Sequence, residues 1–243
     1  MYTKTLRAEM TKLRRSPVWL PFFLVPLLPA VMGTFNYLQN TAILTQEWYS
    51  LWTQHTLFLC YFFFPILIGV YTAYLLRLEH THHNWNAMMS APVKPVYLYL
   101  AKLTLCAVMV CLTQLWIGLL FIISGKLCGF TTPIPPELLV WLVSGMLGGL
   151  VIATLQYCLS LVIKSFAVPV GISLAGGIAG FVAFAKGLGV WFPYSLYSLG
   201  MRANDPGGAL AVHPLLYIGN SLLFIILGII FSSLWMSHKD INT

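Results

Sequence analysis

Residues 138–163 read LLVWLVSGMLGGLVIATLQYCLSLVI, a run of 26 residues that contains no Asp, Glu, Lys or Arg. An α-helix rises about 1.5 Å per residue, so roughly 20 apolar residues cross the hydrocarbon core of a bilayer, which is about 30 Å thick. This run is therefore long enough to span a membrane as a single helix.

Five further apolar runs flank it, at residues 17–38, 55–76, 96–124, 166–185 and 214–236. Charged residues make up only 8% of the 243 residues, against roughly a quarter in a soluble domain. The sequence thus predicts an all-α, polytopic membrane protein whose residues 17–243 form one six-span domain. The first span contains Pro21, Pro26 and Pro29, so it is expected to be kinked or to start irregularly.

Residues 1–16 predict a separate amphipathic helix. Tyr2, Leu6, Met10 and Leu13 recur at helical spacing on one face. Basic side chains occupy the rest of the surface: Lys4, Arg7, Lys12, Arg14 and Arg15. Each basic residue near an anionic bilayer contributes about 1 kcal/mol, so this helix is expected to lie at the membrane interface.

The distribution of basic residues predicts the orientation of the chain. With the N-terminus inside, ten basic residues fall on the cytoplasmic side: Lys4, Arg7, Lys12, Arg14, Arg15, Arg77, Lys94, Lys102, Lys164 and Lys239. Three fall outside, namely Lys126, Lys186 and Arg202. The positive-inside rule then places both termini in the cytoplasm. Because the charges lie at the ends of apolar runs, the net charge of +7 does not indicate nucleic-acid binding.

The most polar segment between spans is residues 77–95, which read RLEHTHHNWNAMMSAPVKP. Trp85, Met88 and Met89 offer an apolar surface, and aromatic anchors of this kind often dominate interface energy. Glu79, Lys94 and Lys102 flank them and are expected to set the register by charge pairing. The segment is predicted to be a cytoplasmic docking element, with a lipid-facing interfacial loop as the alternative.

The charged and metal-like residues bear on the source of energy. None of the six acidic residues lies deep inside an apolar run, which argues against ion coupling through a membrane carboxylate. No phosphate-binding loop is present, so this chain cannot cradle ATP by that route, and if it transports, its energy comes from another subunit. The cluster of His80, His82 and His83 lacks the spacing of zinc hydrolases and is interpreted as a solvated or interface cluster. We therefore predict no metal site and no catalytic residue.

Small and amide side chains within the runs have two interpretations each. Gly171, Gly176 and Gly180 let helices approach closely, either at a subunit interface or inside the monomer. Gln114 and Gln156 are expected to face protein or a wet cavity, where they either bond between helices or line a substrate path.

The external segment 186–213 is rich in aromatic residues. Trp191, Tyr194 and Tyr197 fit an interfacial belt at headgroup depth. The alternative is a platform that contacts an amphiphilic substrate at the outer leaflet.

This layout resembles the permease subunits of type-2 ABC exporters. The insert carries the match with Glu79, Asn84-Trp85, Ser90-Ala91-Pro92-Val93 and Lys102. Within that group the chain most resembles the lantibiotic-immunity permeases of Gram-positive bacteria, on its short length and on the run Phe192-Pro193-Tyr194-Ser195-Leu196. The run of histidines from His80 to His83 departs from the family pattern.

The resemblance implies a transport subunit of the bacterial plasma membrane without an ATPase site of its own. It implies a cytoplasmic coupling helix between spans two and three that docks on an ABC ATPase, present in two copies. The residues implied at this interface are Glu79, His83, Asn84, Trp85, Met88, Met89, Ser90, Pro92, Lys94 and Lys102. It also implies a second permease subunit, related or identical, and a cationic, amphiphilic antimicrobial peptide as cargo. The open alternatives are export of another amphiphile such as a drug or lipid, a membrane-embedded enzyme, and a structural or sensory subunit.

Overall fold

The computed structural model describes residues 2–80 and 95–238, and the regular elements among them are all helical. In chain order they are α1 (Tyr2–Arg14), α2 (Trp19–Gln39), α3 (Glu47–Phe58), the π-helix η1 (Leu59–Phe63), α4 (Phe64–His80), α6 (Pro95–Leu127), α7 (Leu138–Val162), α8 (Ala167–Ala185), the 3-10 turn η2 (Gly189–Trp191), α9 (Ser195–Gly200) and α10 (Pro214–His238).

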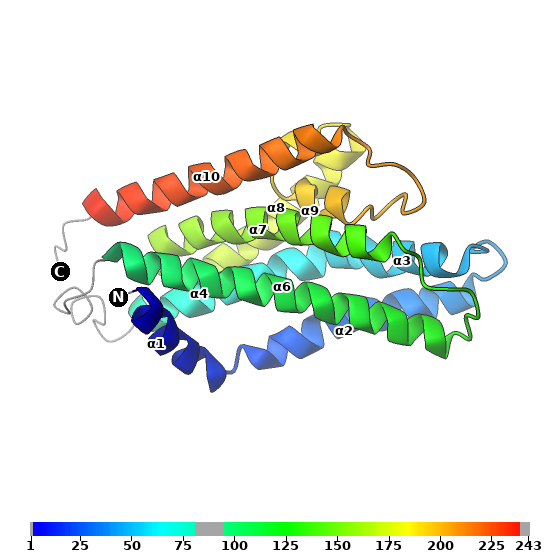
Figure 1. Cartoon of the computed structure of the whole chain (residues 1–243), viewed down its shortest axis with the longest axis horizontal. Helices are drawn as coiled ribbons and strands as arrows, with labels where there is room; N and C mark the ends of the chain where they lie inside the picture. Colours follow the sequence, from blue (N-terminus) through cyan, green and yellow to red (C-terminus); the bar gives the residue numbers. More distant parts are fainter. Residues whose placement is uncertain (1, 81–94, 239–243) are drawn as a thin grey trace.

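Six helices of the described residues are long and apolar enough to cross a membrane. They are Trp19–Gln39, Glu47–Arg77, Val96–Leu127, Leu138–Val162, Ala167–Ala185 and Pro214–Met236. The prediction of an all-α, six-span membrane protein is therefore confirmed. The six helices run along the long axis of the molecule, and both termini lie at the same end (Figure 1), as an even number of crossings requires.

The second span is longer than the sequence analysis predicted. It begins at Glu47 and not at His55, because polar side chains in its first turns find partners. The side-chain amide of Asn36 donates to the Gln54 side-chain oxygen at 2.5 Å, and the Thr53 hydroxyl donates to the Ser50 carbonyl. Polar residues that are bonded in this way no longer mark the end of a membrane helix.

The span Glu47–Arg77 changes its winding at η1, where five residues form a π-helix. Such short π segments insert an extra residue into an α-helix and are frequent at functional sites. A Cβ on Gly177 of α8 would collide with the Tyr61 carbonyl oxygen, so α8 packs directly against the π-helical backbone. Only glycine allows this approach.

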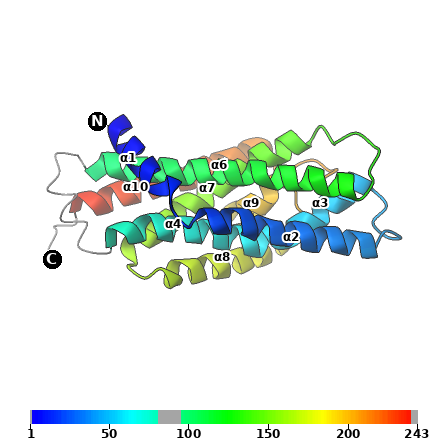
Figure 2. The same cartoon turned by 90° about the horizontal axis from the view of Figure 1, so that it is seen from below.

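The centre of the bundle is formed by α4 and α7 (Figures 1 and 2). Helix α4 packs against α6, α7 and α8, while α7 packs against α4, α6, α9 and α10. A Cβ on Gly148 of α7 would lie 2.7 Å from the backbone carbon and oxygen of Leu196 in α9. The short helix α9 therefore sits against a bare stretch of α7 backbone.

The outer helices expose large apolar side chains along their length. Examples are Leu20 and Phe35 of α2, Phe181 of α8, and Leu215 and Leu227 of α10. Such a surface suits hydrocarbon or a partner helix. Helix α2 continues through Pro26 and Pro29 and is assigned as one helix.

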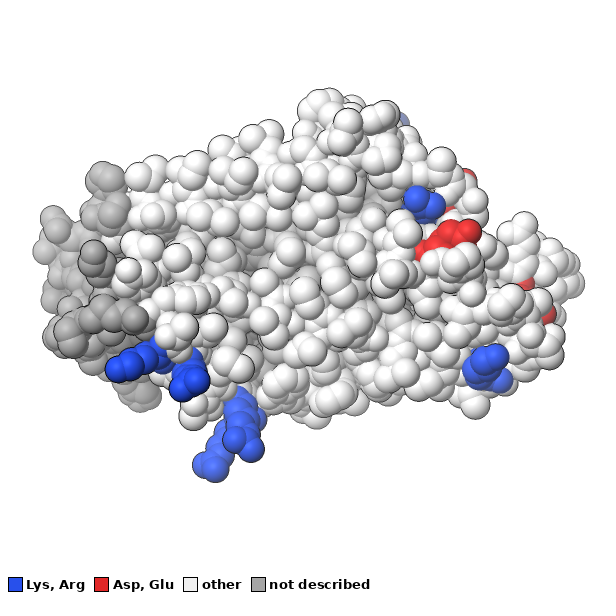
Figure 3. Space-filling model, in the orientation of Figure 1, with Lys and Arg blue, Asp and Glu red and all other residues white. Residues whose placement is uncertain are grey.

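Charged side chains gather at the two ends of the molecule. In Figure 3, Lys and Arg side chains project near α1, both signs occur at the opposite end, and the visible middle is uncharged. We call the end that carries α1 and both termini the termini end, and the end that carries residues 40–46, 128–137 and 186–213 the loop end.

Candidate functional site

Most of the predicted ATPase-interface residues lie outside the described residues. These are His83, Asn84, Trp85, Met88, Met89, Ser90, Pro92 and Lys94, together with His82 of the histidine cluster. Glu79 and His80 end α4, but their side chains are not described. The helices on either side, α4 and α6, define where this segment leaves and rejoins the bundle.

The predicted interface residue Lys102 is described, and it is buried. Its side chain is 1% exposed, and its ammonium group donates to the Glu9 carboxylate at 2.5 Å and to the Leu75 carbonyl oxygen at 3.2 Å. Its position beside the insert in the sequence predicts an accessible charge, whereas the fold turns Lys102 inward. The reason is Glu9, whose opposite charge lies 93 residues away in sequence and next to Lys102 in space.

Helix α1 is held against α6 through more than this pair. The hydroxyls of Tyr2 and Thr104 lie 2.7 Å apart. At its other end, the Trp19 indole donates to the Leu13 carbonyl oxygen at 3.0 Å. The inward face of α1 thus consists of Tyr2, Leu6, Glu9 and Leu13, while Met10 is 53% exposed.

Electrostatics favour the ionised form of Glu9. Burial by itself would raise the pKa of this carboxyl group, but the ammonium groups of Lys102 and Lys12 outweigh burial and hold the pKa below its ordinary value of 4.5. Lys12 lies 2.7 Å from the second Glu9 oxygen. At neutral pH the Glu9 carboxyl group is therefore ionised.

The outward face of α1 is basic. Lys4, Arg7, Lys12, Arg14 and Arg15 are all exposed. The helix therefore presents protein contacts on one side and positive charge on the other, an arrangement suited to the boundary between the bundle and an anionic surface.

Gln114 of α6, a substrate-path candidate, is fully buried and bonded. Its side-chain oxygen accepts a hydrogen bond from the Tyr197 hydroxyl at 3.0 Å, and its amide nitrogen lies 2.7 Å from the Met201 sulfur. The Tyr197 ring stacks on Phe64 with centroids 3.7 Å apart. The inter-helix bonding interpretation describes Gln114 in this structure.

Gln156 of α7 makes an equivalent contact with Tyr194, which lies three residues before Tyr197 in the chain. Its amide donates to the Tyr194 hydroxyl at 2.5 Å, and both residues are buried. The predicted external aromatic segment is therefore partly internal. Tyr194 and Tyr197 lie inside the protein because the two glutamines provide partners for their hydroxyls.

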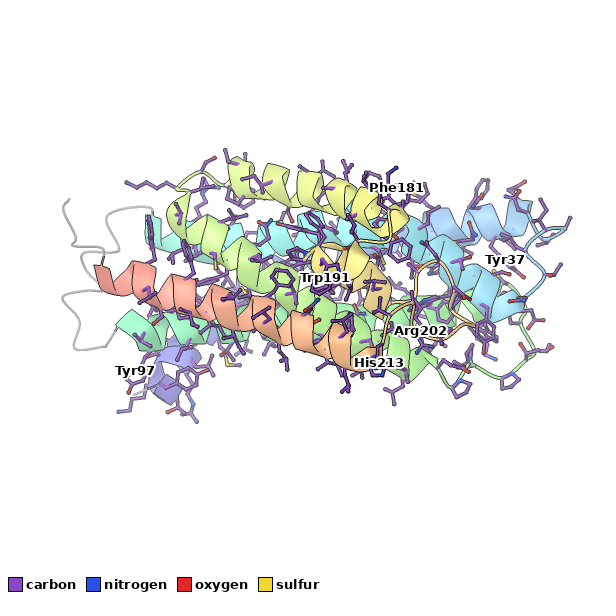
Figure 4. All side chains as sticks on the ribbon, turned by 90° about the horizontal axis from the view of Figure 1, so that it is seen from above. Tyr37, Tyr97, Phe181, Trp191, Arg202 and His213 are labelled. Atoms are coloured by element: carbon purple, nitrogen blue, oxygen red, sulfur yellow. The ribbon has the colours of Figure 1, made fainter. Side chains whose placement is uncertain are left out.

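Trp191 differs from its two aromatic neighbours, since it is 61% exposed. Figure 4 shows it beside α10 in the segment that joins α8 to α10, together with Arg202 farther along. Arg202 has a positive φ of 46°, and its guanidinium donates to the Gly208 carbonyl oxygen at 2.9 Å. Of the predicted aromatic trio, only Trp191 is accessible from outside.

The three glycines predicted for subunit packing separate into two groups. A Cβ on Gly176 would meet the Tyr194 ring at 2.6 Å, and one on Gly180 would lie 3.1 Å from the Ser195 nitrogen. These two glycines therefore pack inside the monomer, the alternative that the sequence left open. Gly171 faces open space, with no atom of the described chain within 4 Å of a Cβ placed there.

Two features of this site had no signal in the sequence. The pairing of Glu9 with Lys102 joins residues far apart in sequence, and only a three-dimensional arrangement brings them together. The burial of Tyr194 and of α9 depends on hydroxyl and amide groups that also suit an aqueous loop. Among the described residues, no group of three or more His, Cys, Asp and Glu side chains is arranged to hold a metal ion.

The family of this chain follows from its similarity to known protein families. No curated protein matches the chain. Residues 5–180, from α1 to most of α8, match the family described as ABC-2 family transporter protein. This match covers more than half of the chain, so the protein belongs to the ABC-2 transporter family, whose members are multi-pass membrane permease subunits that work with an ABC ATPase.

Proposed function

We propose that this chain is the permease subunit of an ATP-driven exporter that removes a cationic, amphiphilic antimicrobial peptide of the lantibiotic type from a bacterial plasma membrane. ATP and Mg²⁺ bind to the partner ATPase, which is present in two copies. A second permease subunit, identical or related, completes the transporter.

The observation that carries this proposal is the placement of charge along the spans. Within the six described spans, charged side chains occur only near the ends, at Glu47, Arg77, Lys102 and Lys126. Ion-coupled transporters keep ionisable groups near mid-membrane. A bundle with this charge distribution draws its energy from an attached ATPase.

The same charges support the orientation. The exposed basic face of α1 and both termini lie at one end (Figures 1 and 3), which the positive-inside rule places in the cytoplasm. The insert 81–94 joins α4 to α6 at this end. Trp85, Met88 and Met89 of the insert are proposed to dock into a cleft of the ATPase, with Glu79 and Lys94 setting the register.

The peptide substrate is supported by the resemblance of residues 192–196 to immunity permeases and by the exposure of Trp191 next to them. An exposed indole at the membrane surface suits contact with an amphiphile, because its ring is apolar and its N–H is polar. A drug or lipid has the same amphiphilic character and is distinguished from a peptide by the test below.

The test replaces the proposed anchor of the docking segment. Trp85→Ala is expected to abolish co-purification with the ATPase and resistance to the peptide while leaving the amount of chain in the membrane unchanged, because truncating a central aromatic anchor commonly costs 2 kcal/mol or more, roughly thirtyfold or more in affinity. Pull-down from detergent and growth inhibition by a lantibiotic measure the two effects.

The matched control is Leu215→Ala, an exposed apolar residue at the loop end. It is expected to preserve both readouts. Retained ATPase binding and retained resistance in Trp85→Ala would contradict the docking role. If the unaltered chain binds the ATPase but confers resistance to a drug and not to any peptide, the substrate is a drug and not a peptide.

A further inference from the structure

The Lys102 side chain connects three helices at the termini end of the bundle. It belongs to α6, its ammonium group binds Glu9 of α1 at 2.5 Å, and it also donates to the Leu75 carbonyl oxygen of α4 at 3.2 Å. Lys102 and Glu9 are 1% and 3% exposed at their side chains. Such an arrangement fixes the relative positions of α1, α4 and α6 at one point.

This point lies close to both ends of the insert. Leu75 precedes the end of α4 at His80 by five residues, and Lys102 follows the start of α6 at Pro95 by seven. A partner that pulls on residues 81–94 therefore acts first on the two helices that Lys102 joins. Any relative movement of α4 and α6 that starts at the insert changes the distances from Lys102 to Glu9 and Leu75 before it reaches the loop end.

Helix α1 is attached to the same unit at three places. The Tyr2 and Thr104 hydroxyls join its start to α6, Glu9 joins its middle to Lys102, and the Leu13 carbonyl joins its end to Trp19 of α2. A shift of α6 is thus passed to α1 and onward to the first turn of α2. The outward basic face of α1 moves along the membrane surface with it.

A buried ion pair is well suited to hold such a joint. Its attraction is strong in surroundings of low dielectric constant, and removal of Glu9 leaves the buried Lys102 ammonium group without this carboxylate. Separating Glu9 from Lys102 is therefore costly, so the contact between α1 and α6 is expected to stay formed while the helices move.

We infer that the Glu9–Lys102 pair makes α1 a moving part of the transporter, so that ATP-driven displacement of α4 and α6 is transmitted through Lys102 to α1 and α2. This inference rests on the proposed function, because it requires an ATPase that acts on the insert. Lys102 is a positioning residue in this scheme and does not contact the substrate.

The first arm of the test asks whether the pair holds α1 in place, and it uses the purified chain in lipid nanodiscs. Hydrogen–deuterium exchange of peptides from residues 2–15 is compared among the unaltered chain, Glu9→Gln and Lys102→Met. Both single variants are expected to exchange roughly a hundredfold faster in α1, with residues 138–162 unchanged. Arg7→Gln, which removes an exposed charge from the same helix, is the matched control and is expected to change nothing.

The double variant Glu9→Lys with Lys102→Glu restores opposite charges with their positions exchanged. It is expected to return α1 exchange to within about threefold of the unaltered chain. Should a single variant fail to accumulate in the membrane, recovery of accumulation by the exchanged pair supports the joint equally. Unchanged α1 exchange in both single variants would overturn it.

The second arm uses the complex with its ATPase and measures peptide exported per ATP hydrolysed. The single variants are expected to keep ATPase binding and to lose at least about tenfold in this ratio, and the exchanged pair is expected to regain it. Full export per ATP with a detached α1 would overturn the transmission role. Failure of the unaltered chain to bind an ATPase would instead overturn the proposed function, so the two failures are distinguishable.

Discussion

Two buried polar regions hold this bundle together, and they are built from different chemistry. At the termini end, the Glu9–Lys102 ion pair fastens α1 to α6. Toward the loop end, neutral hydrogen bonds join Gln114 to Tyr197 of α9 and Gln156 to Tyr194, which directly precedes α9. Breaking an ion pair in a buried site exposes the full cost of a lone charge, whereas breaking a neutral bond costs much less. The comparison predicts one rigid joint and one region that opens at lower cost.

The largest expected effect comes from Glu9→Gln. It leaves the Lys102 ammonium buried without its carboxylate, so the free energy of unfolding is expected to fall by about 3–5 kcal/mol. Thermal unfolding of the chain in nanodiscs measures the change, with Arg7→Gln as an exposed control on the same helix. A loss of about 2 kcal/mol or less would place this pair in the same energetic class as the neutral contacts.

An intermediate effect is expected from Gln114→Leu. The substitution keeps the approximate volume but removes the acceptor for the Tyr197 hydroxyl, which is fully buried. A cost of about 1–2 kcal/mol is expected in the same unfolding assay. Leu115→Ala, at the adjacent and 57% exposed position, serves as the control and should cost less. If Gln114→Leu costs as much as Glu9→Gln, the distinction between the two regions fails.

The smallest effect over the physiological range is expected from pH. Because the pKa of Glu9 lies below its ordinary value of 4.5, the pair contributes its full stabilisation above that value and loses it as pH falls through the lower, native pKa. Exchange in α1, corrected for its intrinsic pH dependence, should stay constant from about pH 8 to 5 and rise only under more acidic conditions. A rise between pH 7 and 5 would show that a different group controls α1.

The sequence predicted the spans well because composition alone determines whether a helix tolerates hydrocarbon. It placed the third to sixth spans within a few residues of their observed bounds. It missed the first two turns of the second span, where Thr53 and Gln54 look aqueous until their partners are known. It likewise did not predict the π-helix at Leu59–Phe63, against which Gly177 packs closely.

The candidate site was harder to predict because it depends on which side chains meet. Lys102 was assigned to the surface, since nothing near it in sequence neutralises its charge. Tyr194 and Tyr197 were assigned to an external segment for the same reason: their partners, Gln156 and Gln114, lie in other helices. Long-range pairing of polar groups is the information that a single sequence lacks.

Between the Glu9–Lys102 ion pair and the insert, α4 and α6 each extend by roughly one to two helical turns. The helices continue past Leu75 and Lys102 by five and seven residues, about 8 and 10 Å at the rise of an α-helix. Mobile ions at physiological strength screen exposed charges over about 8 Å. Added salt should therefore weaken the attraction between the basic face of α1 and an anionic bilayer, and also the charge pairing proposed for Glu79 and Lys94, while the buried Glu9–Lys102 pair is screened much less.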